Sequence, residues 1–338
     1  MQIIENFSLQ SYNTFGIEVK AKCFALFRNI KDLSQILEQK KISLDQLFVL
    51  GGGSNILFTQ DYNGLMLKSA INGIEIIEET NEYVYVKVGG GEIWHNFVLH
   101  CVNQNWGGVE NLSLIPGTVG AAPIQNIGAY GAELKDTFYE VEILHLDSLI
   151  KQTLSKEACK FAYRDSIFKQ EYKGKIVILS VTFKLNKIPI VNTSYGDINK
   201  ELESQKISSP TIQDVSRAVC KIRSSKLPDP NELGNAGSFF KNPIVSDSQF
   251  ETLKAKYPTI VGYKSGNNLT KLAAGWLIEQ CGWKGKRIGD AGVHKNQALV
   301  LVNYGKAKGS EIIDLAHKIQ DSVKEKFSVD IEPEINIL

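Results

Sequence analysis

The sequence has little of several features that would assign it to a particular class of protein. Its 338 residues carry a net charge of only +1, so no overall electrostatic field favours a nucleic acid or a membrane surface as a partner. The five cysteines include no CxxC pair and the five histidines no HExxH spacing, which argues against a disulfide framework and against a metal site. No apolar run approaches the ~18 residues of a membrane span. We therefore expect a cytoplasmic protein with no metal and no membrane insertion.

Two nucleotide-binding motifs and a secretion signal are also missing. No GxGxxG follows a strand and no GxxxxGK[ST] occurs, so neither the usual dinucleotide-binding fold nor a P-loop is supported. The segment from Met1 to Tyr12 has no basic start followed by an apolar run, so we expect no signal peptide.

Helical and strand patterns alternate along the chain. We predict strands at 22–28, 46–50, 83–88, 140–146, 176–185 and 297–303, and helices at 31–40, 92–103, 211–224, 247–256, 270–281 and 309–326. Thr211 or Ser209 is placed to cap the helix at 211–224. The segment 225–236 is rich in proline, glycine and asparagine and indicates a domain boundary.

Glycine-rich turns are the main chemical signal in the first half of the chain. They occur at Gly51–Asn55, at Gly89–Gly91 and in a run from Pro116 through Gly120 that continues to Gly131. Glycine lets backbone N–H groups approach a phosphate closely, so several such turns in one region favour a large anionic cofactor such as a flavin or a nucleotide. One such turn alone would be only a tight turn.

Basic residues gather near the predicted domain boundary. Lys221 and Arg223 end the helix predicted at 211–224, Lys226 follows in the loop, and more lysines follow towards the C-terminus. This cluster suits a pyrophosphate, but cations at a helix C-terminus also simply favour the helix dipole. Both interpretations stay open at this point.

A family resemblance rests on a series of short motifs in a fixed order. They are Asn13–Gly16, Leu50–Asn55, Glu110–Leu112, Ile115–Gly117, Pro123–Gly131, Tyr163–Ser166, Gly234–Pro243, Ala273–Gln280, Gln297–Val300 and Glu332–Glu334. Together they cover nearly the whole chain, which resembles the UDP-N-acetylenolpyruvoylglucosamine reductase (UDP-N-acetylmuramate dehydrogenase) family. The stretch Ser194–Asp197 is similar to the longer of that family's two subtypes.

The resemblance implies an α+β fold with a FAD-binding module of the p-cresol methylhydroxylase type. Its two α+β subdomains would occupy residues 1–70 and 71–225, and a substrate-binding domain residues 226–327. Residues 328–338 would form a C-terminal strand that returns to the active site. The implied reaction is the NADPH-dependent reduction of UDP-N-acetylglucosamine enolpyruvate to UDP-N-acetylmuramate in peptidoglycan precursor synthesis. FAD would be bound non-covalently, and we expect a monomer.

Three residues would carry the chemistry by this resemblance. Ser238 would donate the proton, although a serine hydroxyl needs a nearby cation or a hydrogen-bond relay to do so. Arg164 would bind the substrate carboxylate in bidentate fashion, and Glu334 would act as an acid or as a polariser. Spacing alone cannot separate Glu334 from Glu332, because alternate residues of a strand share a face.

The remaining site residues follow from the same motifs. The diphosphate would be bound by Tyr195, Lys226, Asn242 and Gln297. FAD would be held by Gly51, Gly52, Gly53, Ser54, Asn55, Ile115, Pro116, Gly117 and Gly128.

One position departs from the family pattern. Asn336 stands where an arginine is common, two residues after Glu334, which weakens any claim that a cation follows the glutamate. Because a frayed end would position a catalytic group poorly, we expect 335–338 to be paired in a sheet. Two alternatives remain: another FAD-dependent oxidoreductase on the same scaffold, or a catalytically silent sensor of nucleotide sugars. Ser238, Tyr195 and Glu334 together have no evident use for the substrate of another such oxidoreductase. The intact set of Ser238, Arg164 and Glu334 argues against a sensor.

Overall fold

The computed structural model describes residues 2–40 and 43–338, which divide into two compact units. The first unit comprises the chain up to Phe7 together with Ala21–Gly52 and Asn63–Ser225. The second comprises Ser8–Lys20, Gly53–Tyr62 and Lys226–Leu338, so the N-terminal half contributes two segments to it. The predicted division at residue 70 into two FAD-binding subdomains stays a prediction. No helix in the described part of the chain is long and apolar enough to cross a membrane.

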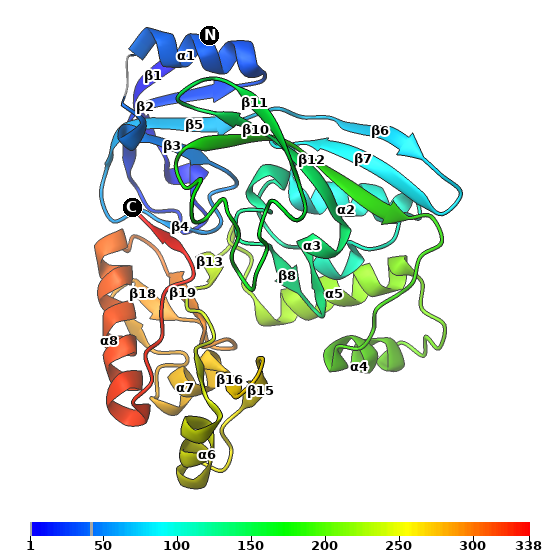
Figure 1. Cartoon of the computed structure of the whole chain (residues 1–338). Helices are drawn as coiled ribbons and strands as arrows, with labels where there is room; N and C mark the ends of the chain where they lie inside the picture. The colour runs from blue at the N-terminus through cyan, green and yellow to red at the C-terminus, as the bar shows by residue number, and fades with distance from the viewer. Residues whose placement is uncertain (1, 41–42) are drawn as a thin grey trace. The chain divides into compact units, whose positions relative to one another are not determined.

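The first unit contains two sheets. One has the strand order β1-β2-β5-β3, formed by Ile3–Ser8, Lys20–Phe27, Tyr62–Ser69 and Leu47–Leu50. The other has the order β11-β10-β12-β7-β6, formed by Lys151–Ser155, Phe138–His145, Ile176–Asn186, Tyr83–Gly89 and Ile74–Glu79 (Figure 1). In β7 every second side chain is buried, as its alternating valines predict. The central strand β12 is buried along most of its length, because its side chains pack into two different hydrophobic clusters.

Helices complete the core of this unit. They are α1 (Ile30–Lys40), α2 (Trp94–Asn103), α3 (Leu134–Thr137), α4 (Gly196–Ser204) and α5 (Ile212–Lys226), the last of which ends at the first residue of the second unit. In α1, Leu33 and Ile36 are fully buried in a cluster that includes residues of both sheets. At the start of α5, the Thr211 hydroxyl accepts a hydrogen bond from the Asp214 N–H at 3.3 Å, so Thr211 rather than Ser209 is the cap.

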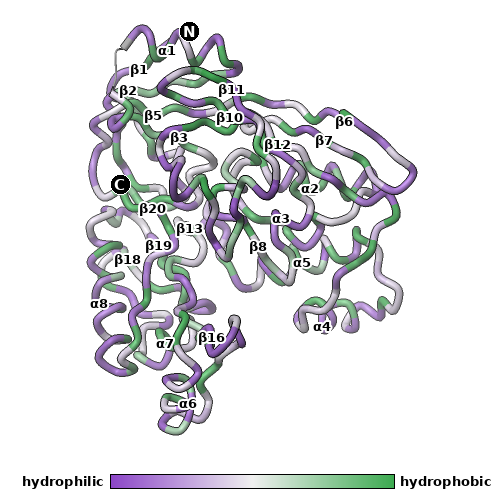
Figure 2. The backbone as a smooth tube through the Cα atoms, in the orientation of Figure 1, coloured by the Kyte–Doolittle hydropathy of each residue, from purple (hydrophilic) through white to green (hydrophobic). Residues whose placement is uncertain are grey.

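The second unit is built around the antiparallel sheet β13-β19-β18-β17. These strands are Gly234–Ser238, Val300–Asn303, Ala291–Val293 and Arg287–Ile288. The long helix α8 (Gly309–Phe327) contacts β18 and β19 (Figure 1). Along α8 hydrophobic and hydrophilic residues alternate (Figure 2). An apolar stripe on this helix is buried, as its helical spacing predicts, and consists of Ile312, Ala316, Ile319, Val323 and Phe327. The helix ends at Ser328, whose left-handed backbone (φ 54°) stops it.

The rest of this unit corrects one prediction. A small sheet, β14-β16-β15, consists of Ile244–Ser246, Leu269–Leu272 and Gly262–Lys264, beside α6 (Asp247–Lys256) and α7 (Ala274–Gln280). The helix predicted at 270–281 was therefore wrong in its first turn, which is the strand β16. Thr270 is buried there, and its hydroxyl donates to Asp247 at 2.6 Å. Likewise β19 begins at Val300 and not at 297.

The C-terminal residues are paired, as predicted. Strand β20 (Asn336–Ile337) lies parallel to β4 (Ile56–Leu57) within the second unit. The last residue adds further bonds, because the Leu338 N–H donates to Leu57 O at 2.9 Å and Leu338 O accepts from the Thr59 N–H at 2.6 Å. The chain around Glu334 is therefore held by main-chain hydrogen bonds and is not a frayed end.

Candidate active site

The three glycine-rich turns predicted to hold an anionic cofactor meet one another in the first unit. A Cβ atom on Gly52 would lie 2.6 Å from the Cα of Gly117, and a Cβ on Gly120 would lie 2.8 Å from the carbonyl oxygen of Gly90. The Gly120 N–H also donates to Gly90 O at 2.9 Å. Only glycine permits these backbone-to-backbone contacts, and they gather the N–H groups of separate turns in one small region.

A half-buried lysine lies beside the point where these glycine turns meet. Lys68, near the end of β5, donates from Nζ to the carbonyl oxygen of Gly51 at 2.8 Å. Burial lowers the pKa of Lys68. Sequence reasoning missed this residue, although a charge that ends the apolar run from Leu65 to Leu67 was a usable signal.

Arg164 lies at the tip of a tight turn in the first unit. Ala162 and Asp165 exchange two backbone hydrogen bonds, of 3.0 and 3.3 Å, and Arg164 between them has a left-handed φ of 55°. The Asn126 side chain donates to Ala162 O at 3.1 Å, so the motif that contains Asn126 holds the turn in place. A non-glycine residue in this conformation is strained, and such strain often marks a functional position.

Tyr195 precedes the first residue of α4 in the same unit. Its side chain is 48% exposed and its ring meets the Tyr130 ring edge-on, with the centroids 5.3 Å apart. Asn111, from the predicted Glu-Asn-Leu motif, is buried and donates to Tyr130 O and to Asn192 O, each at 2.9 Å. Asn111 therefore links the segment that follows Gly128 to the segment that precedes Tyr195.

The second unit brings Ser238 and Glu334 together. Ser238 ends β13 and pairs with Val300 of β19. The Glu334 N–H donates to the carbonyl oxygen of Phe239 at 2.7 Å, so the backbone of the glutamate lies beside the residue that follows the serine. Both side chains are half-buried, with part of each surface open to a ligand.

The structure also distinguishes Glu334 from Glu332. The Glu332 carboxylate is 75% exposed and pairs with Lys241 at 3.4 Å. Glu334 is less exposed than Glu332 and lies one residue after the bridge between Phe240 and Pro333. Burial therefore favours Glu334, a distinction that spacing in the sequence could not make.

Two predicted diphosphate ligands present amide groups in the second unit. Asn242 Oδ1 accepts from the Ala274 N–H at 3.0 Å, and Gln297 Oε1 accepts from the Leu299 N–H at 3.3 Å. Each oxygen is thus engaged, while neither amide NH₂ group has an acceptor among the residues that the structure describes. Lys226 is exposed at the end of α5. The NH₂ groups are suitable donors to an anion.

The predicted site residues come from both units. The first unit contains Gly51, Gly52, Ile115, Pro116, Gly117, Gly128, Arg164 and Tyr195. The second contains Gly53, Ser54, Asn55, Lys226, Ser238, Asn242, Gln297 and Glu334.

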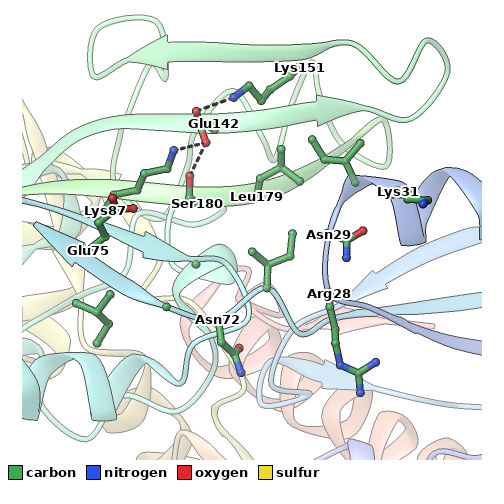
Figure 3. Close-up of a pocket in the computed structure, with 15 residues that line it drawn as sticks. Arg28, Asn29, Lys31, Asn72, Glu75, Lys87, Glu142, Lys151, Leu179 and Ser180 are labelled. Carbon is green, nitrogen blue, oxygen red and sulfur yellow. Dashed lines mark hydrogen bonds and ion pairs between the residues drawn. The ribbon is translucent and has the colours of Figure 1, made fainter. Parts of the chain in front are cut away.

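The first unit also has a cavity of about 680 Å³ that these residues do not line (Figure 3). Arg28 lies at its edge, and Glu142 lies between Lys87 at 2.7 Å and Lys151 at 3.0 Å, with a further hydrogen bond from Ser180 at 3.0 Å. Burial by itself would raise the pKa of Glu142, but these three hydrogen bonds lower it to about 2. The Glu142 carboxylate is already paired with two lysines and a serine hydroxyl of the protein, so we do not take this cavity as the candidate active site.

Two models of known protein families match parts of this chain. Residues 21–152 match the family model of a FAD binding domain. Residues 229–338 match the model of the C-terminal domain of UDP-N-acetylenolpyruvoylglucosamine reductase. The fold and these matches define a FAD-dependent flavoprotein with a separate C-terminal domain, which confirms the predicted α+β class and the predicted cofactor.

Relatives along the whole chain specify the family. The UDP-N-acetylenolpyruvoylglucosamine reductase of Flavobacterium johnsoniae is 51% identical over 339 residues, covering 100% of both chains. That of Chromobacterium violaceum is 49% identical, covering 100% of this chain and 99% of the relative. The chain belongs to the UDP-N-acetylenolpyruvoylglucosamine reductase family, as its motifs predicted. The crystal structure of the Thermus caldophilus enzyme has the same fold, with a TM-score of 0.69 at 21% identity over 99% of this chain and 98% of that one.

Proposed function

We propose that this protein reduces UDP-N-acetylglucosamine enolpyruvate to UDP-N-acetylmuramate with NADPH, through bound FAD. The single observation that carries the proposal is the backbone bond from Glu334 to Phe239, which gathers Ser238 and Glu334 in a chain of this family. The reaction is a step of peptidoglycan precursor synthesis, and we place it in the cytoplasm. A monomer would suffice for it.

The point where the turns at Gly52, Gly90, Gly117 and Gly120 meet fits FAD. Cβ atoms at Gly52 and Gly120 would fill the space where the turns meet, so side chains there would close the region to a large anion. The backbone of Gly51, Gly52 and Ile115–Gly117 would hold the cofactor, together with Gly53–Asn55 and Gly128. Bound FAD would take hydride from NADPH and supply it to the terminal carbon of the enolpyruvyl ether.

Residues of the chain would stabilise the charge that develops on the substrate and would supply the proton. Hydride addition to the terminal carbon leaves an electron pair on the adjacent carbon, delocalised into the carboxylate. Arg164 would bind that carboxylate with its guanidinium and stabilise the developing charge. Ser238 Oγ would give its proton to the adjacent carbon. Glu334 would act as an acid or would polarise the carboxylate, and either role requires the glutamate to be protonated or paired with a cation.

The diphosphate would be bound by groups on several elements. The NH₂ groups of Asn242 and Gln297 are neutral donors whose partner oxygens are already engaged. Lys226 would add a positive charge, and the exposed hydroxyl of Tyr195 would donate a further hydrogen bond. Together they would orient the sugar nucleotide so that its enolpyruvyl group faces the flavin.

An anaerobic half-reaction experiment tests the proposal. The yellow holoprotein is first bleached with NADPH, and UDP-N-acetylglucosamine enolpyruvate is then added while the absorbance of the flavin is followed. We expect the oxidised spectrum to return, with UDP-N-acetylmuramate formed in equal amount. A holoprotein that is bleached but never reoxidised would exclude this reaction, whereas a protein that binds the sugar nucleotide without any bleaching would be a sensor.

A further inference from the structure

Leu114 connects the Glu110–Leu112 turn to the Ile115–Gly117 segment and has both of its backbone polar groups bound by side chains. Its N–H donates to Nδ1 of His95 at 2.9 Å. Its carbonyl oxygen accepts from Nε of Arg223 at 3.1 Å. Leu114 also has a left-handed φ of 57°, which is strained for a large side chain and needs outside support.

The two side chains come from helices that hold the same segment at other points. His95 lies in the first turn of α2, where the Trp94 indole N–H donates to Leu112 O at 2.9 Å and the Trp94 backbone N–H donates to Gly117 O at 3.0 Å. Arg223 lies in the last turn of α5. Both ends of the segment 112–117 are therefore tied to α2, while His95 and Arg223 fix its strained centre.

We propose that His95 and Arg223 are positioning residues that hold the segment 114–117 in the conformation that binds FAD. The inference rests on the proposed function in one respect, namely that Ile115, Pro116 and Gly117 contact the cofactor. Arg223 is thereby assigned a structural task that its place at a helix C-terminus does not reveal. Neither residue needs to touch the reacting atoms.

The hydrogen bond requires His95 to be neutral, because its Nδ1 accepts the Leu114 N–H and a protonated ring has no acceptor. Burial lowers the pKa of His95 from its ordinary value of 6.5, and the Arg223 charge lowers it further.

Other charged groups near the ring are engaged elsewhere. Glu110, on the turn that packs against α2, accepts from the Gly108 N–H at 2.6 Å. Glu92, just before α2, accepts from the Gly73 N–H at 2.7 Å. On the α5 side, the charge of Arg164 acts on Arg223.

The sign of the pH dependence follows from this lowered pKa. The stabilisation by His95 is complete above the unfolded value of 6.5 and is lost as the pH falls through the lower value of the folded protein. If FAD binds only the conformation in which His95 accepts the Leu114 N–H, as we propose, FAD affinity should decline as His95 becomes protonated below pH 6.5.

Equilibrium binding of FAD to the apoprotein, followed by flavin fluorescence between pH 5 and pH 8, tests the proposal. His95→Leu removes the acceptor and leaves a part-buried N–H unsatisfied, so we expect affinity to fall about tenfold at every pH. His95→Asn places an amide oxygen near the former Nδ1 and does not titrate. It should bind nearly as well as the wild type at pH 8 and should lack the decline at low pH. Arg223→Gln should weaken binding and keep the decline, but the decline should move to higher pH because the charge that lowers the pKa of His95 is removed.

A matched control is His317→Asn, which changes an exposed histidine of α8 in the second unit. It should leave both affinity and pH profile unchanged. Wild-type affinity in His95→Leu, or an undiminished acid decline in His95→Asn, would overturn the proposal while leaving the proposed function intact. If His95→Leu does not fold, the pH profile of His95→Asn still decides. A wild-type protein that binds no FAD would instead overturn the proposed function, and this inference with it.

Discussion

A single methyl group at Gly52 should measurably weaken FAD binding. The Cβ of Gly52→Ala would lie 2.6 Å from Gly117 Cα and 3.3 Å from both the carbonyl carbon and the nitrogen of Gly117. Carbon atoms pack at about 3.5–4.0 Å, so the two segments would have to separate by about 1 Å. Hydrogen bonds hold both segments in place, because Gly51 O accepts from Lys68 Nζ at 2.8 Å and Gly117 O accepts from the Trp94 N–H at 3.0 Å.

The magnitude follows from overpacking. An extra methyl group with no room to relax costs about 1–3 kcal/mol. If that cost falls wholly on the bound arrangement, FAD affinity drops by about 5–150-fold. If the junction is equally tight without FAD, the same cost appears as a lower free energy of unfolding.

Two measurements on the same protein check this reasoning. FAD titration of the apoprotein gives the dissociation constant, and urea unfolding with and without FAD gives the free energy of unfolding. Gly196→Ala serves as the control, because a Cβ atom there meets nothing within 4 Å. If Gly52→Ala matched the control in both measurements, the contact between the glycine turns would not have the tightness that the argument assigns to it.

Three further outcomes are expected. Ser238→Ala should bind FAD and be bleached by NADPH as in the wild type, while turnover falls about 10²–10⁴-fold; near-normal turnover would mean that the proton comes from another group. Glu334→Gln should lower turnover at least about tenfold, whereas Glu332→Gln, which breaks only the exposed pair with Lys241, should keep turnover within about twofold of the wild type. Steady-state rates of the two variants test this, and equal losses would contradict the assignment of the catalytic role to Glu334. Glu142→Gln should lower the free energy of unfolding by about 1 kcal/mol at pH 7, because both lysines of the network reach solvent. The pKa of Glu142 is lowered from 4.5 to about 2, so the difference in free energy of unfolding between variant and wild type should shrink as the pH falls from 4.5 to 2. Urea unfolding measures this difference, and a constant value would argue against the stabilising role of the Glu142 carboxylate.

Long periodic segments were predictable from the sequence. The alternation in β7 and the apolar stripe of α8 report directly which face is buried, and the core places them as predicted. The order of the motifs identified the family and the cofactor, because a functional site restricts which residues are possible at positions far apart in the chain. Even the expectation that 335–338 would be paired followed from the need to hold Glu334.

Only the tertiary structure decided features that depend on a distant partner. Residues 269–272 have no pattern that separates a strand from a helix, and they form β16 because β14 and β15 pair with them on either side. Glu332 and Glu334 are alike in spacing, and burial beside Phe239 distinguishes them. His95 and Arg223 lie 128 positions apart and bind the N–H and the carbonyl oxygen of one residue, Leu114, a relation without any local signal. Periodicity records which side of an element is buried, while hydrogen-bond partners are chosen when the elements pack together.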